Sequence, residues 1–190
     1  MAKHLVLIDN VKKELEALER ELHEEAGEKG IIISSIIYDE NNKRFFSDVK
    51  KRINDIITND NDPMIKLRIV CDACLTSLEE NNIMDLDLVK SVTGIQQLLK
   101  IDKFLKTKGV EYDLYLMSGF ISKKLRKSTL IKPLNELGDV FAGVIDTPVL
   151  EDYEIDYGSD EVPNYVGVLP EELITNNNLQ SFINIVFYKL

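Results

Sequence analysis

The sequence predicts a mixed α/β protein, either an α+β fold or a three-layer α/β fold, with a helix-rich N-terminal half and a strand-rich C-terminal half. Three observations support this prediction: a charged helical pattern at the N-terminus, apolar faces at helical spacing up to about residue 108, and alternating or β-branched apolar segments after residue 110. A chain of 190 residues fits one compact domain. We therefore expect an amphipathic N-terminal helix over residues 1–30 and a single mixed α/β domain over residues 31–190.

The first segment has apolar residues at steps of three and four, separated by charged residues. This seam consists of Ile8, Val11, Leu15, Leu18 and Leu22. It predicts a helix that Gly27 and Gly30 end. We favour a surface helix lying on its own domain, and a dimerising coiled-coil arm is the alternative because the apolar strip is narrow.

The middle of the chain contains a candidate hairpin and three candidate helices. The segment "IIISSIIYDENNKRFF" (31–46) is β-branched, has a polar turn and returns with two phenylalanines, which favours a strand hairpin. Helices are expected from Ser47 or Asp48 to Asn59, over 64–80, and over 85–108 with Gly109 closing the last.

The second half contains four candidate strands, at 110–118, 138–146, 164–169 and 181–190. A helix is expected over 120–136, and a short one near residue 171. Helix and strand alternate between residues 110 and 146, and this alternation supports the three-layer α/β fold as an alternative to the α+β fold.

Composition excludes several classes of function. The formal net charge is −10, which disfavours direct binding to nucleic acid or to an anionic membrane. The N-terminus "MAKHLVLIDN" is a poor signal peptide, and no window approaches about 18 consecutive apolar residues. With two cysteines and no secretion signal, we expect a cytoplasmic protein.

Complete motifs for nucleotide binding or histidine-based catalysis are missing. The glycines form neither a G-x-G-x-x-G fingerprint nor a P-loop. Both histidines, His4 and His23, fall in the expected N-terminal helix, which argues against a catalytic triad or a histidine-rich metal site. Cys71 and Cys74 have C-x-x-C spacing, but they lie on the apolar face of an expected helix, so we interpret them as core residues.

Two expected strands end in polar residues, Ser118 and Asp146. If these strands are parallel neighbours, their carboxyl ends form the crevice in which α/β sheets place ligands. The alternative catalytic set consists of Asp113, Asp146, Ser118 and either Lys123 or Lys124, with Asp146 and Asp152 as alternative metal ligands. Such a carboxylate site would use Mg²⁺ and act on a phosphorylated substrate as a phosphohydrolase or a nuclease-like enzyme.

The segment "EDYEIDYGSDE" (151–161) packs six carboxylates into eleven positions but lacks the spacing of a calcium loop. Alternating tyrosine and isoleucine favour an edge strand with its charges in water. The other hypotheses are an acidic interface that presents tyrosines and a divalent-metal site. The candidate binding residues are Asp152, Tyr153, Glu154, Asp156, Tyr157, Asp160 and Glu161.

Our leading hypothesis is a non-enzymatic binding or assembly protein that works through this acidic segment and needs no cofactor. Its expected partner is a protein with a basic surface, and self-association through the N-terminal helix is a second possible contact. The alternatives are the Mg²⁺-dependent carboxylate enzyme and an acidic mimic of nucleic acid that occupies a basic protein groove. We expect no membrane association.

Overall fold

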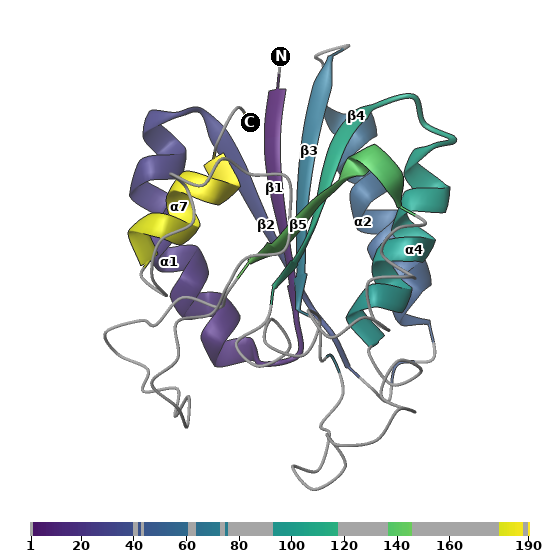
Figure 1. Cartoon of the computed structure of the whole chain (residues 1–190), viewed down its shortest axis with the longest axis horizontal. Helices are drawn as coiled ribbons and strands as arrows, with labels where there is room; N and C mark the ends of the chain where they lie inside the picture. The colour runs from purple at the N-terminus through teal and green to yellow at the C-terminus, as the bar shows by residue number, and fades with distance from the viewer. Residues whose placement is uncertain are drawn as a thin grey trace, which may run out of the picture.

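The chain forms a parallel β-sheet that lies between two layers of helices (Figure 1). The computed structural model describes residues 2–39, 42, 44–60, 64–72, 75, 93–117, 137–145, 179–187 and 190. Within these residues the fold is therefore the three-layer form of the mixed α/β fold that the sequence predicts.

The sheet has five strands in the order β2-β1-β3-β4-β5, and every neighbouring pair is parallel. The strands are β1 (Ala2–Asp9), β2 (Ile31–Ile37), β3 (Ile65–Asp72), β4 (Glu111–Met117) and β5 (Phe141–Ile145). This is the flavodoxin-like order of doubly wound sheets. The chain moves outward from β1 to β2 and then crosses to β3 on the other side, so the topological switch point lies between β1 and β3.

Among the described residues, four helices cover the two faces of the sheet. On one face lie α1 (Lys12–Glu28) and α7 (Leu179–Phe187), and on the other lie α2 (Phe45–Asn59) and α4 (Thr93–Leu105) (Figure 1). A short 3₁₀ turn, η2 (Gly138–Val140), leads into β5. No described helix is long and apolar enough to cross a membrane.

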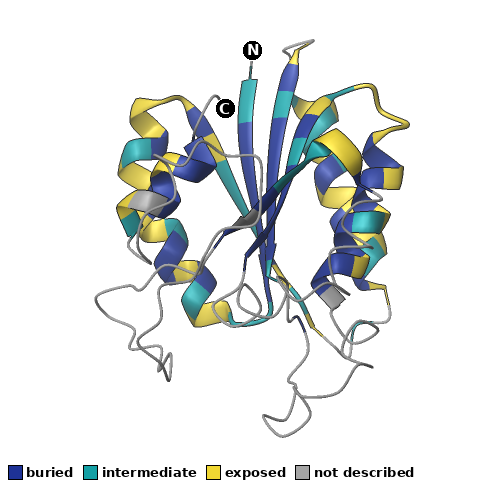
Figure 2. Cartoon of the chain, in the orientation of Figure 1, coloured by how far each residue is buried: buried dark blue, intermediate teal, exposed yellow. Residues whose placement is uncertain are grey.

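The inner strands are buried on both faces because helices cover both (Figure 2). In β1, Leu5 and Leu7 pack in the cluster that contains α1 and α7, whereas Val6 and Ile8 pack in the cluster that contains α2 and α4. All four side chains are fully buried. The core is thus two apolar layers that share one sheet.

The first correction concerns the N-terminus. Residues 2–9 were expected in a helix, but they form β1, an inner strand, and the helix begins only at Lys12. A strand buried on both faces is apolar without interruption, so "HLVLI" matches a helical seam as well as a strand. Leu15, Leu18 and Leu22 of α1 are buried against the sheet of the same chain.

The expected hairpin over residues 31–46 is also wrong. Its first half is a strand, β2, but that strand pairs in parallel with β1. The two phenylalanines that were expected in a return strand, Phe45 and Phe46, begin α2. Phe45 is the first residue on the buried face of α2. Its ring contacts that of Tyr38 at a centroid distance of 4.5 Å.

In two further segments the structure has a strand where a helix was expected, or a helix where a strand was expected. Residues 65–72 form β3 rather than a helix, and residues 179–187 form α7 rather than a strand. The start of β3 alternates apolar and polar residues, "IKLRI", which is a strand period that the helical assignment overlooked. In α7, Leu179, Phe182, Ile183 and Val186 have helical spacing, which the strand assignment overlooked. Consequently strands occur throughout the described chain and are not concentrated in its C-terminal half.

The remaining described elements match the expectations within a few residues. They are α2, the later part of the helix expected over 85–108, β4 and β5. Gly30 and Gly109 follow α1 and α4 with φ angles of 64° and 67°, the left-handed conformation that ends a helix. The elements expected at 120–136, 153–157, 164–169 and near 171 lie outside the described residues.

Candidate functional site

The carboxyl ends of all five strands lie at one edge of the sheet because the strands are parallel. The two strands at the switch point both end in an aspartate, β1 in Asp9 and β3 in Asp72. Ile8 is the register partner of Cys71, so the two aspartates follow paired residues on adjacent strands. Open α/β sheets bind their ligands at this place.

Asp9 is a buried carboxylate with only 3% of its surface exposed. Its Oδ1 accepts a hydrogen bond of 2.8 Å from the backbone N–H of Val11, which leads into α1. Burial raises the pKa of Asp9, and the backbone N–H groups of Val11 and Asn10 lower it in part. The strand end therefore holds a carboxyl group whose charge is only partly compensated by the backbone.

Asp72 lies beside Asp9, and the negative charges of both affect the Cys71 thiol. Asp72 is half-buried, and its register partner in β4 is Met117. The pKa of the buried Cys71 thiol is raised well above its ordinary value, first by burial and then by the negative charges of Asp72 and Asp9. Two charges of the same sign thus converge on the end of β3.

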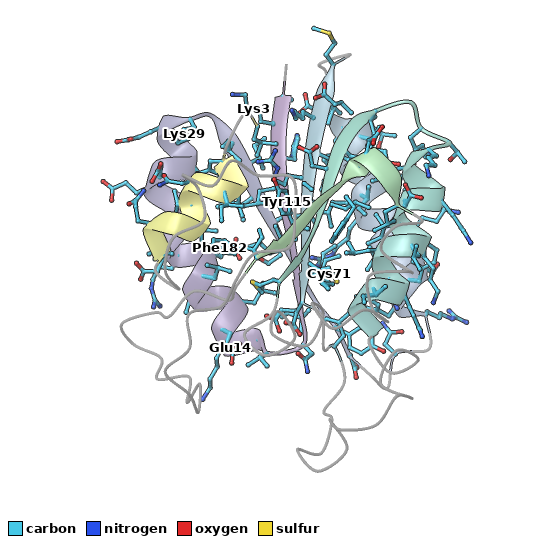
Figure 3. All side chains as sticks on the ribbon, viewed as in Figure 1. Lys3, Glu14, Lys29, Cys71, Tyr115 and Phe182 are labelled. Carbon is cyan, nitrogen blue, oxygen red and sulfur yellow. The ribbon has the colours of Figure 1, made fainter. Side chains whose placement is uncertain are left out.

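Two helices begin near this edge. Glu14 stands in the first turn of α1, and burial together with the charge of Asp9 raises its pKa. At the start of α4, the carbonyl of Gly94 lies 3.9 Å from Cys71 Sγ. Figure 3 shows Glu14 and Cys71 toward the carboxyl end of the sheet, with Lys3 and Lys29 at the opposite end. Helix N-termini carry partial positive charge, which favours an anion at this edge.

The structure satisfies the condition on which the predicted crevice depends. β4 and β5 are parallel neighbours, and Met117 is the register partner of Ile145. Ser118 and Asp146 are the next residues in sequence after these partners. Their own placement, like that of Lys123, Lys124 and Asp152, lies outside the described residues.

Asp113 lies away from the carboxyl edge. It stands four residues before the end of β4, and its Oδ2 accepts a hydrogen bond of 2.6 Å from Nη2 of the buried Arg68. Nη1 of Arg68 donates to the backbone carbonyls of Ile185 and Val186 in α7. Asp113 thus belongs to an ion pair that holds the C-terminal helix against the sheet.

The acidic segment 151–161, with all seven candidate binding residues, lies outside the described residues, and so does Cys74. Cys71 is a buried free thiol, which agrees with its interpretation as a core residue, although it lies in a strand rather than in a helix. Within the described part of the chain, no three His, Cys, Asp or Glu side chains are grouped so as to hold a metal ion.

Sequence reasoning missed Asp9 and Asp72 because it placed both in helices. The signal that identifies them is local: a β-branched apolar run ends in an aspartate at each position, in "LVLID" and in "LRIVCD". In α/β folds such a residue ends a buried strand at the ligand-binding edge.

No protein-family model and no curated protein matches this chain. Function must therefore be inferred from the geometry of the carboxyl edge and from the distribution of charge in the sequence.

Proposed function

We propose that this chain handles a phosphoryl group at the carboxyl edge of its sheet, with Asp9 and Asp72 binding Mg²⁺ and Asp72 accepting the phosphoryl group. One observation carries the proposal: two carboxylates of the same sign end the adjacent strands β1 and β3 at the switch point of a parallel sheet. Placing like charges together costs free energy in the absence of a cation, which favours a cation as part of the site.

The number of ligands supports Mg²⁺ in particular. Mg²⁺ keeps several of its waters and is commonly bound by one or two carboxylates together with a phosphate of the substrate. Two carboxylates without a third His, Cys, Asp or Glu ligand among the described residues are consistent with this mode of binding. The bound cation would offset the repulsion between the carboxylates and the incoming phosphate.

The location of the two histidines supports a carboxylate as the nucleophile. His4 lies five residues before Asp9 in β1, about 16 Å away along the strand. His23 is exposed, eleven positions beyond the first residue of α1, about 16 Å along that helix. Neither histidine is placed to serve as the base at this edge. An ionised carboxylate needs no base, because it attacks phosphorus directly.

In the proposed step, a carboxylate oxygen of Asp72 forms a bond to phosphorus. The bond between phosphorus and the leaving oxygen of the donor breaks, and the leaving group departs with that electron pair. The N–H groups at the start of α1 and α4 favour the additional negative charge. The product is an aspartyl phosphate on the end of the central strand.

The test is intact-mass spectrometry of the full chain after incubation with a small acyl phosphate and Mg²⁺. We expect one phosphoryl group per chain, lost on chelation of Mg²⁺ before mixing and lost in Asp72→Asn. Asp55→Asn, which changes an exposed carboxylate on α2, is the matched control and should be phosphorylated normally. Equal phosphorylation of Asp72→Asn would contradict the assignment, as would steady release of phosphate without a phosphorylated chain.

A second candidate function is favoured by the distribution of charge. Residues 146–178 contain nine Asp and Glu residues and no Lys or Arg, whereas the whole chain has a net charge of −10. We propose the acidic segment 151–161 as a contact for a protein with a basic surface, as the sequence predicts. Changing Asp152, Glu154, Asp156, Asp160 and Glu161 to amides should abolish a salt-sensitive association in a pull-down. An unchanged set of bound proteins would remove this candidate.

A further inference from the structure

The two edges of the sheet differ in how open they are to another strand. At the β5 edge, the register with β4 shifts between Leu114 and Tyr115, and Gly143 has a φ of 143°. At the β2 edge, seven residues pair with β1 in continuous register. The sequence of β2, "IIISSII", contains no charge and no proline. Bulges, prolines and charges are the usual protection of an edge strand. The residues of β2 supply none of them, and the only cover seen for its outward backbone groups among the described residues is the Arg52 side chain of α2 on the carbonyl of Ser35.

The backbone groups that point outward from β2 can be identified. Directly after β2, the N–H of Tyr38 donates a 2.7 Å hydrogen bond to the carbonyl of Asp9 in β1. The backbone direction alternates along a strand, so even-numbered residues face β1 and the odd-numbered Ile31, Ile33, Ser35 and Ile37 present N–H and C=O groups outward. Arg52 of α2 confirms the direction by donating a 2.8 Å hydrogen bond to the carbonyl of Ser35.

The side chains of β2 give the edge two different faces. Ile31 packs with α1, and Ser35 Oγ donates a 2.7 Å hydrogen bond to Glu19 of α1. On the face of α2, Ile36 is buried, but Ile32 is 53% exposed. An added strand would therefore meet a carboxylate on one face and an uncovered isoleucine on the other.

The charge of Glu19 decides which occupant fits. Within the described part of the chain Glu19 forms no ion pair, and the exposed Glu16 lies one turn before it on α1. A second copy paired antiparallel around Ser34 would bring the two Glu19 side chains together on the same face, and their repulsion disfavours that arrangement. A strand with basic side chains on this face would instead be attracted.

We propose that the outer edge of β2 binds an extended, basic segment of a partner protein as a sixth strand of the sheet. In that segment Lys or Arg would alternate with apolar residues. The basic side chains would lie beside Glu19 and Glu16, and the apolar ones would cover Ile32. The added strand would displace Arg52 from the carbonyl of Ser35. Its hydrogen bonds to the outward backbone groups of β2 would supply affinity, and its alternating side chains would supply specificity, as in other cases of strand addition. This contact is separate from the carboxyl edge and does not depend on the phosphoryl proposal.

The experiment titrates the full chain with a peptide that alternates Lys and Val over the seven-residue length of β2, observed by backbone amide NMR. We expect the amides of Ile31, Ile33, Ser35 and Ile37 to shift and to become protected from exchange. The affinity should fall with added salt. A peptide that alternates Glu and Val, and a Lys–Val peptide N-methylated at the residues that face β2, should both fail to bind.

Glu19→Gln removes the charge but keeps an acceptor for Ser35 Oγ. It should weaken binding of the Lys–Val peptide about two- to fivefold, the range of one exposed ion pair. Glu28→Gln, at the far end of α1, is the matched control and should bind like the unmodified chain. The proposal is overturned if the N-methylated peptide binds equally well or if shifts fall outside β2 and α1. It is also overturned if sedimentation shows the chain pairing with itself through β2, a state that Glu19→Gln would strengthen.

Discussion

Charged side chains have different neighbours in two parts of the sheet: the amino half, which comprises the first residues of the strands, and the carboxyl edge, where the strands end. In the amino half, ionisable side chains meet partners that complement them: His4 contacts Asp60 at 2.8 Å, Lys66 contacts Glu111 at 2.8 Å, and Arg68 contacts Asp113 at 2.6 Å. At the carboxyl edge, Asp9 and Asp72 carry the same sign at the ends of adjacent strands.

The difference is between charges that the fold pairs with opposite charges and charges that it places beside like charges. The hydrogen bonds of Arg68 to Asp113 in β4 and to the carbonyls of Ile185 and Val186 in α7 fix these elements relative to one another, although Arg68 Nε has no hydrogen-bond partner among the described residues. Like charges on adjacent strand ends repel each other, and groups perturbed in this way concentrate at functional sites. In this fold, therefore, the sign of the neighbouring charge distinguishes the two groups of ionisable residues better than their burial does.

The largest effect is expected from breaking the buried pair in the amino half. Asp113→Ala removes the carboxylate that pairs with the buried Arg68 guanidinium, whose hydrogen bonds to the backbone carbonyls of Ile185 and Val186 in α7 remain. Breaking such a pair costs about 3–5 kcal/mol, which urea unfolding would measure. The double variant Arg68→Met with Asp113→Leu should recover much of the loss. A cost below about 1 kcal/mol for Asp113→Ala would show that the pair does not hold α7 in place.

The carboxyl edge should respond to Mg²⁺ in a way that the amino half does not. At ten times its dissociation constant, Mg²⁺ should raise the free energy of unfolding by about 1.4 kcal/mol. The melting temperature should then rise by about 3–6 °C. Asp9→Asn should abolish this rise without destabilising the metal-free chain, because burial already disfavours the charge of Asp9.

The control for this measurement is Asp55→Asn on α2, which should keep the full thermal shift. An equal shift in Asp9→Asn would place the cation elsewhere on the chain.

A smaller effect is expected at Tyr112, also in the amino half. Its hydroxyl donates a 2.8 Å hydrogen bond to Oδ1 of the buried Asp102, whose Oδ2 accepts one from Lys106. Tyr112→Phe should cost about 1 kcal/mol near neutral pH, measured by urea unfolding.

The same residue makes stability depend on alkaline pH. Burial, with the hydrogen bond to Asp102 and its charge, raises the pKa of Tyr112 above its ordinary value of 10.0. A raised pKa in the folded state means that this stabilisation is complete below pH 10 and is lost as the pH rises further. Tyr112→Phe should remove that part of the alkaline slope, and an unchanged slope would show that other groups produce it.

The smallest effect is expected for an exposed pair on α1. Lys12 Nζ lies 3.5 Å from Glu16 Oε1, and both side chains are more than half exposed. Lys12→Ala should change the free energy of unfolding by less than about 0.5 kcal/mol. A larger loss would show that α1 depends on its surface charges as well as on its buried face.

Local patterns in the sequence were sufficient for several elements. The amphipathic period of α2, the alternation of β4 and the glycine that closes α4 each depend on residues close together in the chain, so these elements could be predicted. β1 could not, because it is apolar without interruption from Leu5 to Ile8 and shows no decisive period. In β3 and α7 a short strand or helical period is present, but the assignment followed a longer apolar pattern across each segment. The site residues Asp9 and Asp72 were missed for the same reason, since each ends one of the misassigned strands.

The sequence by itself determined the mixed α/β composition, the polar residues that follow two of the strands, and the concentration of negative charge after residue 146. Tertiary structure alone decided that every strand is parallel and that β1 lies between β2 and β3. It also brought Asp9 beside Asp72 and joined Arg68 to α7 across 117 positions of sequence. The physical reason is that a side-chain pattern specifies which face of an element is buried, whereas the choice of neighbouring strand depends on the packing of all the elements together.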